Sequence, residues 1–227
     1  SVLVALLHRA GMLGTARDPL HDALALYGLP TLRLANTRPD GGWGNAAGAG
    51  VGQLQMTAWD SARLLWLLDA DAPPAPWLAP GMPPLLSRSS MGVLRAWLED
   101  QALHEILSST ALAGEPGWVA GLPAQRPPRW LDDDGAVIAG GYRFEADVRP
   151  ASSHATLRFA HKTGTTENYA ADAGIVRGIA PHRRCHYLIA LTSNLGTRYA
   201  PTANCATTWR IPALARTIDA ALMPWLG

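Results

Sequence analysis

The most informative stretch is Phe159-Ala-His-Lys-Thr-Gly-Thr-Thr-Glu-Asn-Tyr-Ala-Ala-Asp-Ala-Gly-Ile-Val176. Residues 156–161, which lead into it, have the pattern of a β-strand, and a polar turn follows the Lys-Thr-Gly tripeptide. Residues 173–176 predict a second strand, and the apolar run within 186–193 predicts a third. Short turns between consecutive strands favour an antiparallel sheet.

Outward from this stretch, the rest of the sequence is mostly helical in pattern. A last helix is expected from about Thr207 to Trp225, after the strands. Because the helical patterns come first and the strands last, the sequence predicts an α+β fold. The earlier helices are expected at residues 2–10, at 20–27 after Asp18-Pro19, from Thr57 onward, at 90–98 and at about 101–108.

Glycine and proline mark the connections between these elements. Residues 36–52 contain six glycines and residues 73–84 are rich in proline, so both are expected to be loops. Residues 114–153 have no decisive pattern, but residues 136–139 and 142–148 are compatible with a hairpin. We therefore expect a partial helical domain over 1–122 and a sheet domain over 123–227, with an inserted segment at about 124–153.

Composition excludes several classes of function. A hydrophobic content of 48% and a charged content of 16% are typical of a globular chain, and a net charge of +1 gives no reason to expect nucleic-acid binding. No uninterrupted apolar run approaches the ~20 residues of a membrane span. Cys185 and Cys205 match no zinc spacing, and either a disulfide or two buried thiols would be compatible with them. We expect no metal and no cofactor.

Three motifs resemble one known family. Lys162-Thr163-Gly164 leads to Asp-Ala-Gly-Ile-Val176, the segment Thr57-Ala-Trp-Asp-Ser-Ala-Arg-Leu-Leu65 is similar to a "T-A-x-D-x-A-x-L-L" helix, and Gly121-Leu-Pro123 precedes the Lys-Thr-Gly strand. Together they resemble the β-lactamase and penicillin-binding-protein superfamily, closest to the class A-like β-lactamase enzyme family, whose signature is S-x-x-K, S-D-N and K-T-G. The resemblance implies a transpeptidase/β-lactamase-like fold and acyl transfer through a serine ester.

The resemblance also implies roles for individual residues. The lysine of the motif organises charge and proton movement near the nucleophile, which would be the role of Lys162. The threonine hydroxyl binds the substrate carboxylate, and the residue after the glycine gives a backbone N–H to the oxyanion hole. These two roles fall to Thr163 and Thr165. The ordinary alternative is that Lys162 is an exposed strand residue and Thr163 a simple β-former.

Substrate contacts are expected along the same strand and the turn after it. Gly164 lets a substrate backbone approach closely, and Thr166 and Glu167 follow it in the turn. Asp172 opens the next strand, near the site in the family. His161 is expected to point away from Lys162 and to be packed or exposed.

The nucleophile is missing. Lys162 is the only lysine, and the residue three positions before it is Phe159, so the chain contains no S-x-x-K. We expect the chain to be the C-terminal part of a longer protein, accompanied by its own N-terminal fragment. The alternative is a β-lactamase-like binding or structural module without chemistry.

Substrate and turnover follow from the same resemblance. The substrate would be a β-lactam or a D-alanyl peptide, which places the protein in the periplasm or outside the cell. No glutamate lies between Thr31 and Thr57, where class A enzymes carry the residue that activates the deacylating water. We therefore expect acylation without rapid release, as in a penicillin-binding protein.

Overall fold

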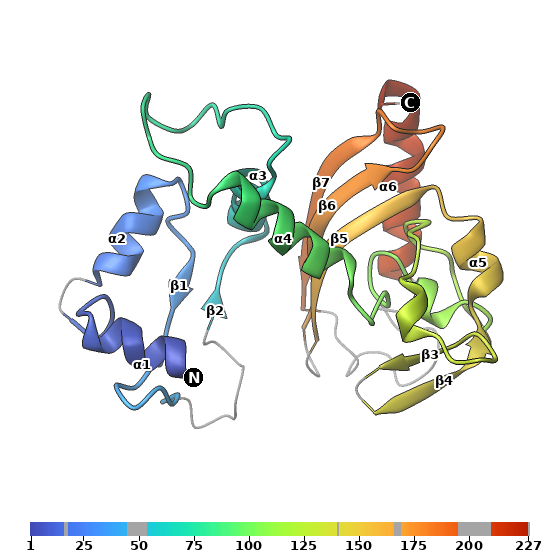
Figure 1. The fold of residues 1–227 in the computed structure, drawn as a ribbon, viewed down its shortest axis with the longest axis horizontal. Helices are drawn as coiled ribbons and strands as arrows, with labels where there is room; N and C mark the ends of the chain where they lie inside the picture. The colour runs from blue at the N-terminus through green and yellow to red at the C-terminus, as the bar shows by residue number, and fades with distance from the viewer. Residues whose placement is uncertain (16–17, 45–53, 140, 166–168, 195–209, 227) are drawn as a thin grey trace. The chain divides into compact units, whose positions relative to one another are not determined.

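The computed structural model describes residues 1–15, 18–44, 54–139, 141–165, 169–194 and 210–226 (Figure 1). The chain divides into two compact units, Ser1–Ser87 and Arg88–Gly227. The protein is an α+β chain with antiparallel sheets and a C-terminal helix, as the sequence predicts. Among the described residues, none of the helices has the length and apolar character that crossing a membrane requires.

The described residues of the first unit form three helices and a two-stranded ribbon. In chain order its elements are α1 (Val2–Arg9), α2 (Pro19–Leu26), β1 (Arg33–Leu34), β2 (Leu54–Gln55) and α3 (Ala58–Leu68). Ser1 caps α1 by accepting from the Val4 amide. Asp18 precedes α2, with Pro19 in the first turn as expected, but the Asp18 side chain makes no capping hydrogen bond. The predicted loops at 36–44 and 73–84 contain no helix and no named strand; residues 45–52 lie outside the described residues.

Asp60 holds the start of α3 in place. Thr57 caps this helix by accepting from the Asp60 amide at 3.2 Å. The Asp60 carboxylate, 2% exposed, accepts from the backbone amide of Thr31 at 2.7 Å and from the Thr31 hydroxyl at 2.5 Å. The carboxylate therefore ties α3 to the segment that follows α2, and it also suits the positive end of the helix dipole.

The second unit is built around a three-stranded antiparallel sheet (Figure 1). Its strand order is β5-β6-β7, and the sheet confirms the three predicted strands. In chain order the named elements are α4 (Arg88–Glu99), β3 (Ala136–Ala139), β4 (Tyr142–Asp147), α5 (Arg149–Ser153), β5 (Leu157–Thr165), β6 (Ala170–Gly178), β7 (His186–Ser193) and α6 (Ile211–Leu226).

The strands extend beyond their predicted bounds. The strand predicted to end at His161 continues as β5 to Thr165, because Lys162, Thr163 and Gly164 pair with Ala173, Asp172 and Ala171 of β6. The Lys-Thr-Gly tripeptide is therefore part of the sheet and does not merely follow a strand.

One face of the sheet packs against α6. Phe159 of β5 and Val176 of β6 lie in one buried cluster with Ile211 and Ala215 of α6. At the same face, the Tyr187 hydroxyl donates to the Asp219 carboxylate at 2.8 Å. Burial, and then the charge of Asp219, raise the pKa of Tyr187. This face is the main core of the unit.

The hairpin β3–β4 confirms the expectation for residues 136–148 and lies over a second, smaller core. Gly135, with a φ of +83°, closes the turn before it by donating to the Asp132 carbonyl at 3.0 Å. Val137 and Val148 are fully buried against Ala111. The segment expected as an insertion thus has apolar packing of its own with residues 111–113.

The helix predicted at 101–108 is wrong. This segment has no helical structure in the fold, because its backbone groups bond to distant partners. The Leu107 amide donates to the Asp172 carboxylate at 3.1 Å, and the Leu107 carbonyl accepts from the Leu122 amide at 2.8 Å. Tertiary hydrogen bonds have replaced the i to i−4 bonds of a helix.

Of the two cysteines, the structure describes only Cys185. Cys185 is a free, buried thiol beside the turn between β6 and β7. Burial raises the pKa of this thiol, so it stays protonated over a wider pH range than an exposed cysteine. Cys205 lies outside the described residues.

Candidate functional site

The Lys-Thr-Gly strand presents its lysine on one face and its threonine on the other. Lys162 is exposed, whereas Thr163 is 9% exposed and lies on the core side. This alternation follows from the two-residue period of a strand. The Lys162 ammonium donates to the backbone carbonyl of Thr163, which holds the charge beside its own strand.

The end of β5 is open. Gly164 and Thr165 are both exposed, and a Cβ added at Gly164 would meet nothing within 4 Å. Backbone from another molecule has room to approach at this point. Thr166 and Glu167, predicted to contact substrate, lie outside the described residues.

β5 is an edge strand of its sheet. Among the described residues its only ladder partner is β6, and its other edge makes one isolated bridge, between Leu157 and Ala124. An edge strand offers unpaired N–H and C=O groups to any extended chain that lies beside it. The Lys162 ammonium is therefore next to a docking edge suited to a peptide-like molecule.

Behind the edge, His161 and Asp172 form a buried pair. The His161 Nδ1–H donates to the Asp172 carboxylate at 2.7 Å, and both side chains are 0% exposed. The second carboxylate oxygen accepts from the Leu107 amide at 3.1 Å. His161 points away from Lys162, as expected, and of the two expected surroundings, packed or exposed, the structure shows the packed one. Asp172, predicted to contact substrate, lies in the interior and contacts these two groups.

Aromatic rings fix the orientation of His161. Phe159 stacks on the imidazole with ring centroids 4.1 Å apart, and His104 meets it edge to face at 4.6 Å. Burial, and then the neighbouring His161 and Arg126, lower the pKa of His104 well below its ordinary value. Neither nitrogen of His104 has a hydrogen-bond partner among the described residues. This imidazole is therefore neutral at pH 7.

Two further charged groups lie close to this pair. Burial raises the pKa of the Glu105 carboxyl, and the negative Asp172 acts in the same direction, whereas His161 and Lys162 lower it. Burial also lowers the pKa of Arg126 to about 10. Glu105 is thus a half-buried carboxyl in the electrostatic field of Lys162, and it holds a proton to higher pH than an exposed glutamate.

His104 and Glu105 were not predicted to lie near the site, because both fall in the segment mistaken for a helix. One signal was available. A histidine among the apolar residues of β5 shares a face of the sheet with an acid on the adjacent strand, and a buried histidine needs such a partner. Pairing His161 with Asp172 would have placed both inside.

The arrangement separates two kinds of chemistry. The Lys162 ammonium is exposed at an open strand edge, where it can attract a carboxylate. The His161–Asp172 pair has no exposed surface, so it acts on a ligand only by holding β5 and β6 in place. Among the described residues, no group of three His, Cys, Asp or Glu side chains could hold a metal ion.

Comparison with known proteins adds no assignment. No family model matches the chain, and no curated protein matches it.

Proposed function

We propose that this chain carries the Lys-Thr-Gly strand of a serine acyltransferase or hydrolase of the β-lactamase and penicillin-binding-protein type. The substrate would be a β-lactam or a D-alanyl peptide, processed outside the cytoplasm. The acylated serine would come from residues outside these 227, since the only lysine has Phe159 three positions before it. In this proposal, residues that precede Ser1 would supply that serine.

One observation carries the proposal. Lys162 is the chain's only lysine, and its exposed ammonium lies on an edge strand directly before an open glycine. A substrate with an amide backbone and a carboxylate can add to the β5 edge, where the ammonium attracts its negative charge. The Thr165 amide, at the end of the strand, would stabilise the oxyanion of the acyl-transfer step.

Two other motifs fit this proposal in their local structure. The "T-A-x-D" segment begins α3, with Thr57 as its cap and Asp60 as a buried anchor. Gly121 packs so tightly that an added Cβ would lie 2.1 Å from the Leu107 carbonyl oxygen, so a glycine is required there. Gly121 precedes Pro123, whose carbonyl accepts from the Leu157 amide at the start of β5.

The sheet can also accept a further strand. Among the described residues β7 pairs only with β6, so its outer edge is available to another strand. In the proposed enzyme, the N-terminal portion would supply this strand together with the nucleophile.

A second candidate, a binding module without chemistry, is favoured by the absent S-x-x-K. In that case the β5 edge would hold a peptide or β-lactam reversibly. The two candidates differ in whether a covalent bond forms, and this difference can be measured directly.

The test is the intact mass of the natural protein, with any residues that precede Ser1, before and after incubation with benzylpenicillin. The enzyme predicts the gain of one penicillin mass. An adduct that persists for hours would indicate slow release, as in penicillin-binding proteins, and a transient adduct would indicate a β-lactamase.

Matched variants connect the result to this strand. Lys162→Ala should slow adduct formation about 10²–10⁴-fold, the usual range for losing a group that assists proton transfer. Arg216→Ala removes an exposed cation on α6 and should leave the rate unchanged. If the natural protein forms no adduct but binds a fluorescent penicillin reversibly, the binding module is correct and the enzyme is not.

A further inference from the structure

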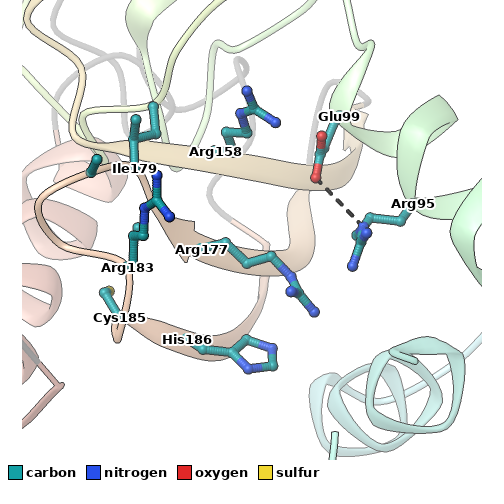
Figure 2. Close-up of a pocket in the computed structure, with 10 residues that line it drawn as sticks. Arg95, Glu99, Arg158, Arg177, Ile179, Arg183, Cys185 and His186 are labelled. Atoms are coloured by element: carbon teal, nitrogen blue, oxygen red, sulfur yellow. Dashed lines mark ion pairs between the residues drawn. The ribbon is translucent and has the colours of Figure 1, made fainter. Parts of the chain in front are cut away.

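A pocket of about 520 Å³ in the second unit has a lining rich in arginine. α4, the three strands and the β6–β7 turn all contribute to it (Figure 2). Its charged and titratable side chains are Arg95, Glu99, Arg158, Arg177, Arg183, Cys185 and His186. Glu99 is the one carboxylate among the described residues of this lining, so the arginines outnumber it by three.

The strand register brings three of the basic residues into one row. Arg158 of β5 lies directly opposite Arg177 of β6, and Arg177 lies opposite His186 of β7. Residues directly opposite each other on neighbouring strands project from the same face of the sheet. Like charges in such positions destabilise a sheet, so the row carries a cost in the absence of a counter-ion.

The turn between β6 and β7 supplies Arg183 from a fixed backbone. The Gly178 amide donates to the Cys185 carbonyl at 2.8 Å, and the Ile179 amide donates to the Thr156 carbonyl at 2.8 Å. A Cβ added at Gly178 would lie 1.6 Å from the His182 carbonyl oxygen, so the turn closes tightly around its glycine. Arg183 therefore projects from an anchored turn.

The remaining wall comes from α4. Arg95 and Glu99 form an ion pair on this helix, with the Arg95 Nε and a Glu99 oxygen 3.8 Å apart (Figure 2). Arg158 and Arg183 form no ion pair with any residue that the structure describes. The single carboxylate is thus associated with Arg95, and the described lining supplies no ion-pair partner for Arg158 or Arg183.

This concentration of charge is local. The whole chain has a net charge of +1, yet the described lining of this one pocket has an excess of three positive charges. Arginine guanidinium groups bind phosphate and carboxylate oxygens in a two-pronged geometry, and several arginines in one pocket favour a multiply charged anion. The volume is within the usual range for a small-molecule site and exceeds what a single inorganic ion fills.

We propose that this pocket binds the phosphate group of a small, multiply charged anion, with Arg158, Arg177 and Arg183 as its ligands. The site is distinct from the Lys162 edge, because Arg158 and Lys162 are four residues apart on one strand, which is a separation of about 13 Å.

Calorimetric titration of the 227-residue chain with inorganic pyrophosphate tests the proposal. Ionic strength is held at 0.15 M with sodium chloride, because long-range attraction between exposed charges is largely screened there. We expect saturable binding of one pyrophosphate per chain. Arg158→Gln and Arg177→Gln should each weaken it at least tenfold, whereas the control Arg216→Gln should bind as the parent chain does.

Circular dichroism melts confirm that each variant is folded. If Arg177→Gln does not fold, Arg183→Gln, on the exposed turn, replaces it in the test. No saturable binding by the folded parent chain, or equal weakening by Arg216→Gln, would overturn the proposal. Acetate that binds as tightly as pyrophosphate would overturn the assignment to a phosphate group. None of these results depends on penicillin acylation, so the two proposals fail separately.

Discussion

The two faces of β5 differ in how their charged and polar side chains are accommodated: those on one face are buried and paired, and those on the other are exposed. On the core face, the imidazole of His161 is enclosed and bonded to the carboxylate of Asp172. On the other face, Arg158 and Lys162 are exposed, and Arg158 lies opposite a second arginine. One strand nine residues long therefore carries a paired polar group inside and exposed cations outside.

The difference shows what burial requires. A polar group removed from water loses several kcal/mol of solvation unless a partner replaces the lost hydrogen bonds, so the inner face has a specific partner for His161. Water and salt screen the outer face, where repulsion between cations costs only ~1 kcal/mol or less. The exposed cations of β5 can therefore serve binding at little cost in stability, whereas the buried His161–Asp172 pair serves the structure.

The largest expected effect comes from breaking the inner pair. Asp172→Ala should lower the free energy of unfolding by about 3–5 kcal/mol, because it leaves His161 Nδ1 and the Leu107 amide without their buried partner. Urea unfolding followed by circular dichroism measures the change. Asp133→Ala, at an exposed carboxylate, is the control and should have little effect. A loss no larger than the control's would mean that the pair contributes nothing to stability.

The space around two glycines, Gly174 and Gly164, differs between the two faces of the sheet. A Cβ added at Gly174 would lie 2.4 Å from the Ala160 carbonyl oxygen and 2.5 Å from the His161 Cβ, whereas one at Gly164 meets nothing within 4 Å. Gly174→Ala should therefore cost about 1–3 kcal/mol, and Gly164→Ala close to zero. Equal unfolding midpoints for the two variants in urea would contradict the difference in packing.

The third prediction concerns pH. The pKa of His104 is lowered in the folded state, so the unfolded chain binds more protons once the pH falls below about 6.5, and stability should decline there. Glu105 has a raised pKa and the opposite slope, since its contribution is lost as pH rises above about 4.5. The two groups must be separated by a variant.

His104→Phe isolates the histidine contribution. The difference in unfolding free energy between this variant and the parent chain should change in the variant's favour as pH falls from 7 to 5. His154→Phe, at an exposed histidine, should show no such trend. A difference that is constant over this pH range would show that His104 does not remain neutral in the fold.

The smallest effect belongs to the outer face. Arg158→Thr removes one of two arginines directly opposite each other and should stabilise the chain by about 0.2–1 kcal/mol. The gain should shrink in 1 M sodium chloride, where screening acts within ~3 Å. Destabilisation at low salt would show that the arginine packs against the sheet and that its charge is not the dominant effect.

The sequence predicted what depends on local patterns. The cap at Thr57, the helix start at Pro19, the hairpin at 136–148 and the three strands follow from spacing and turn residues, and the structure confirms them. The helix prediction for 101–108 was wrong because this segment is held by the Asp172 carboxylate, which accepts from the Leu107 amide 65 positions away in the chain. Helical spacing cannot anticipate that bond.

The two sites differ in the same way. Lys162, Thr163 and Gly164 were visible as a motif because they are consecutive. The row of Arg158, Arg177 and His186 exists only once the register of three strands is known, and a shift of one residue would dissolve it. The sequence alone offered these residues as ordinary strand and turn positions.

Cys185 gives the arginine-lined pocket a built-in chemical reporter. Its thiol is 1% exposed, so an alkylating reagent reaches it only when the β6–β7 turn opens. The labelling rate therefore measures the local opening equilibrium, once Cys205 has been replaced by serine so that a single thiol reacts. An anion that bridges the turn to the sheet would slow labelling in proportion to its occupancy, so the chain records occupancy of this pocket in the time course of one covalent modification.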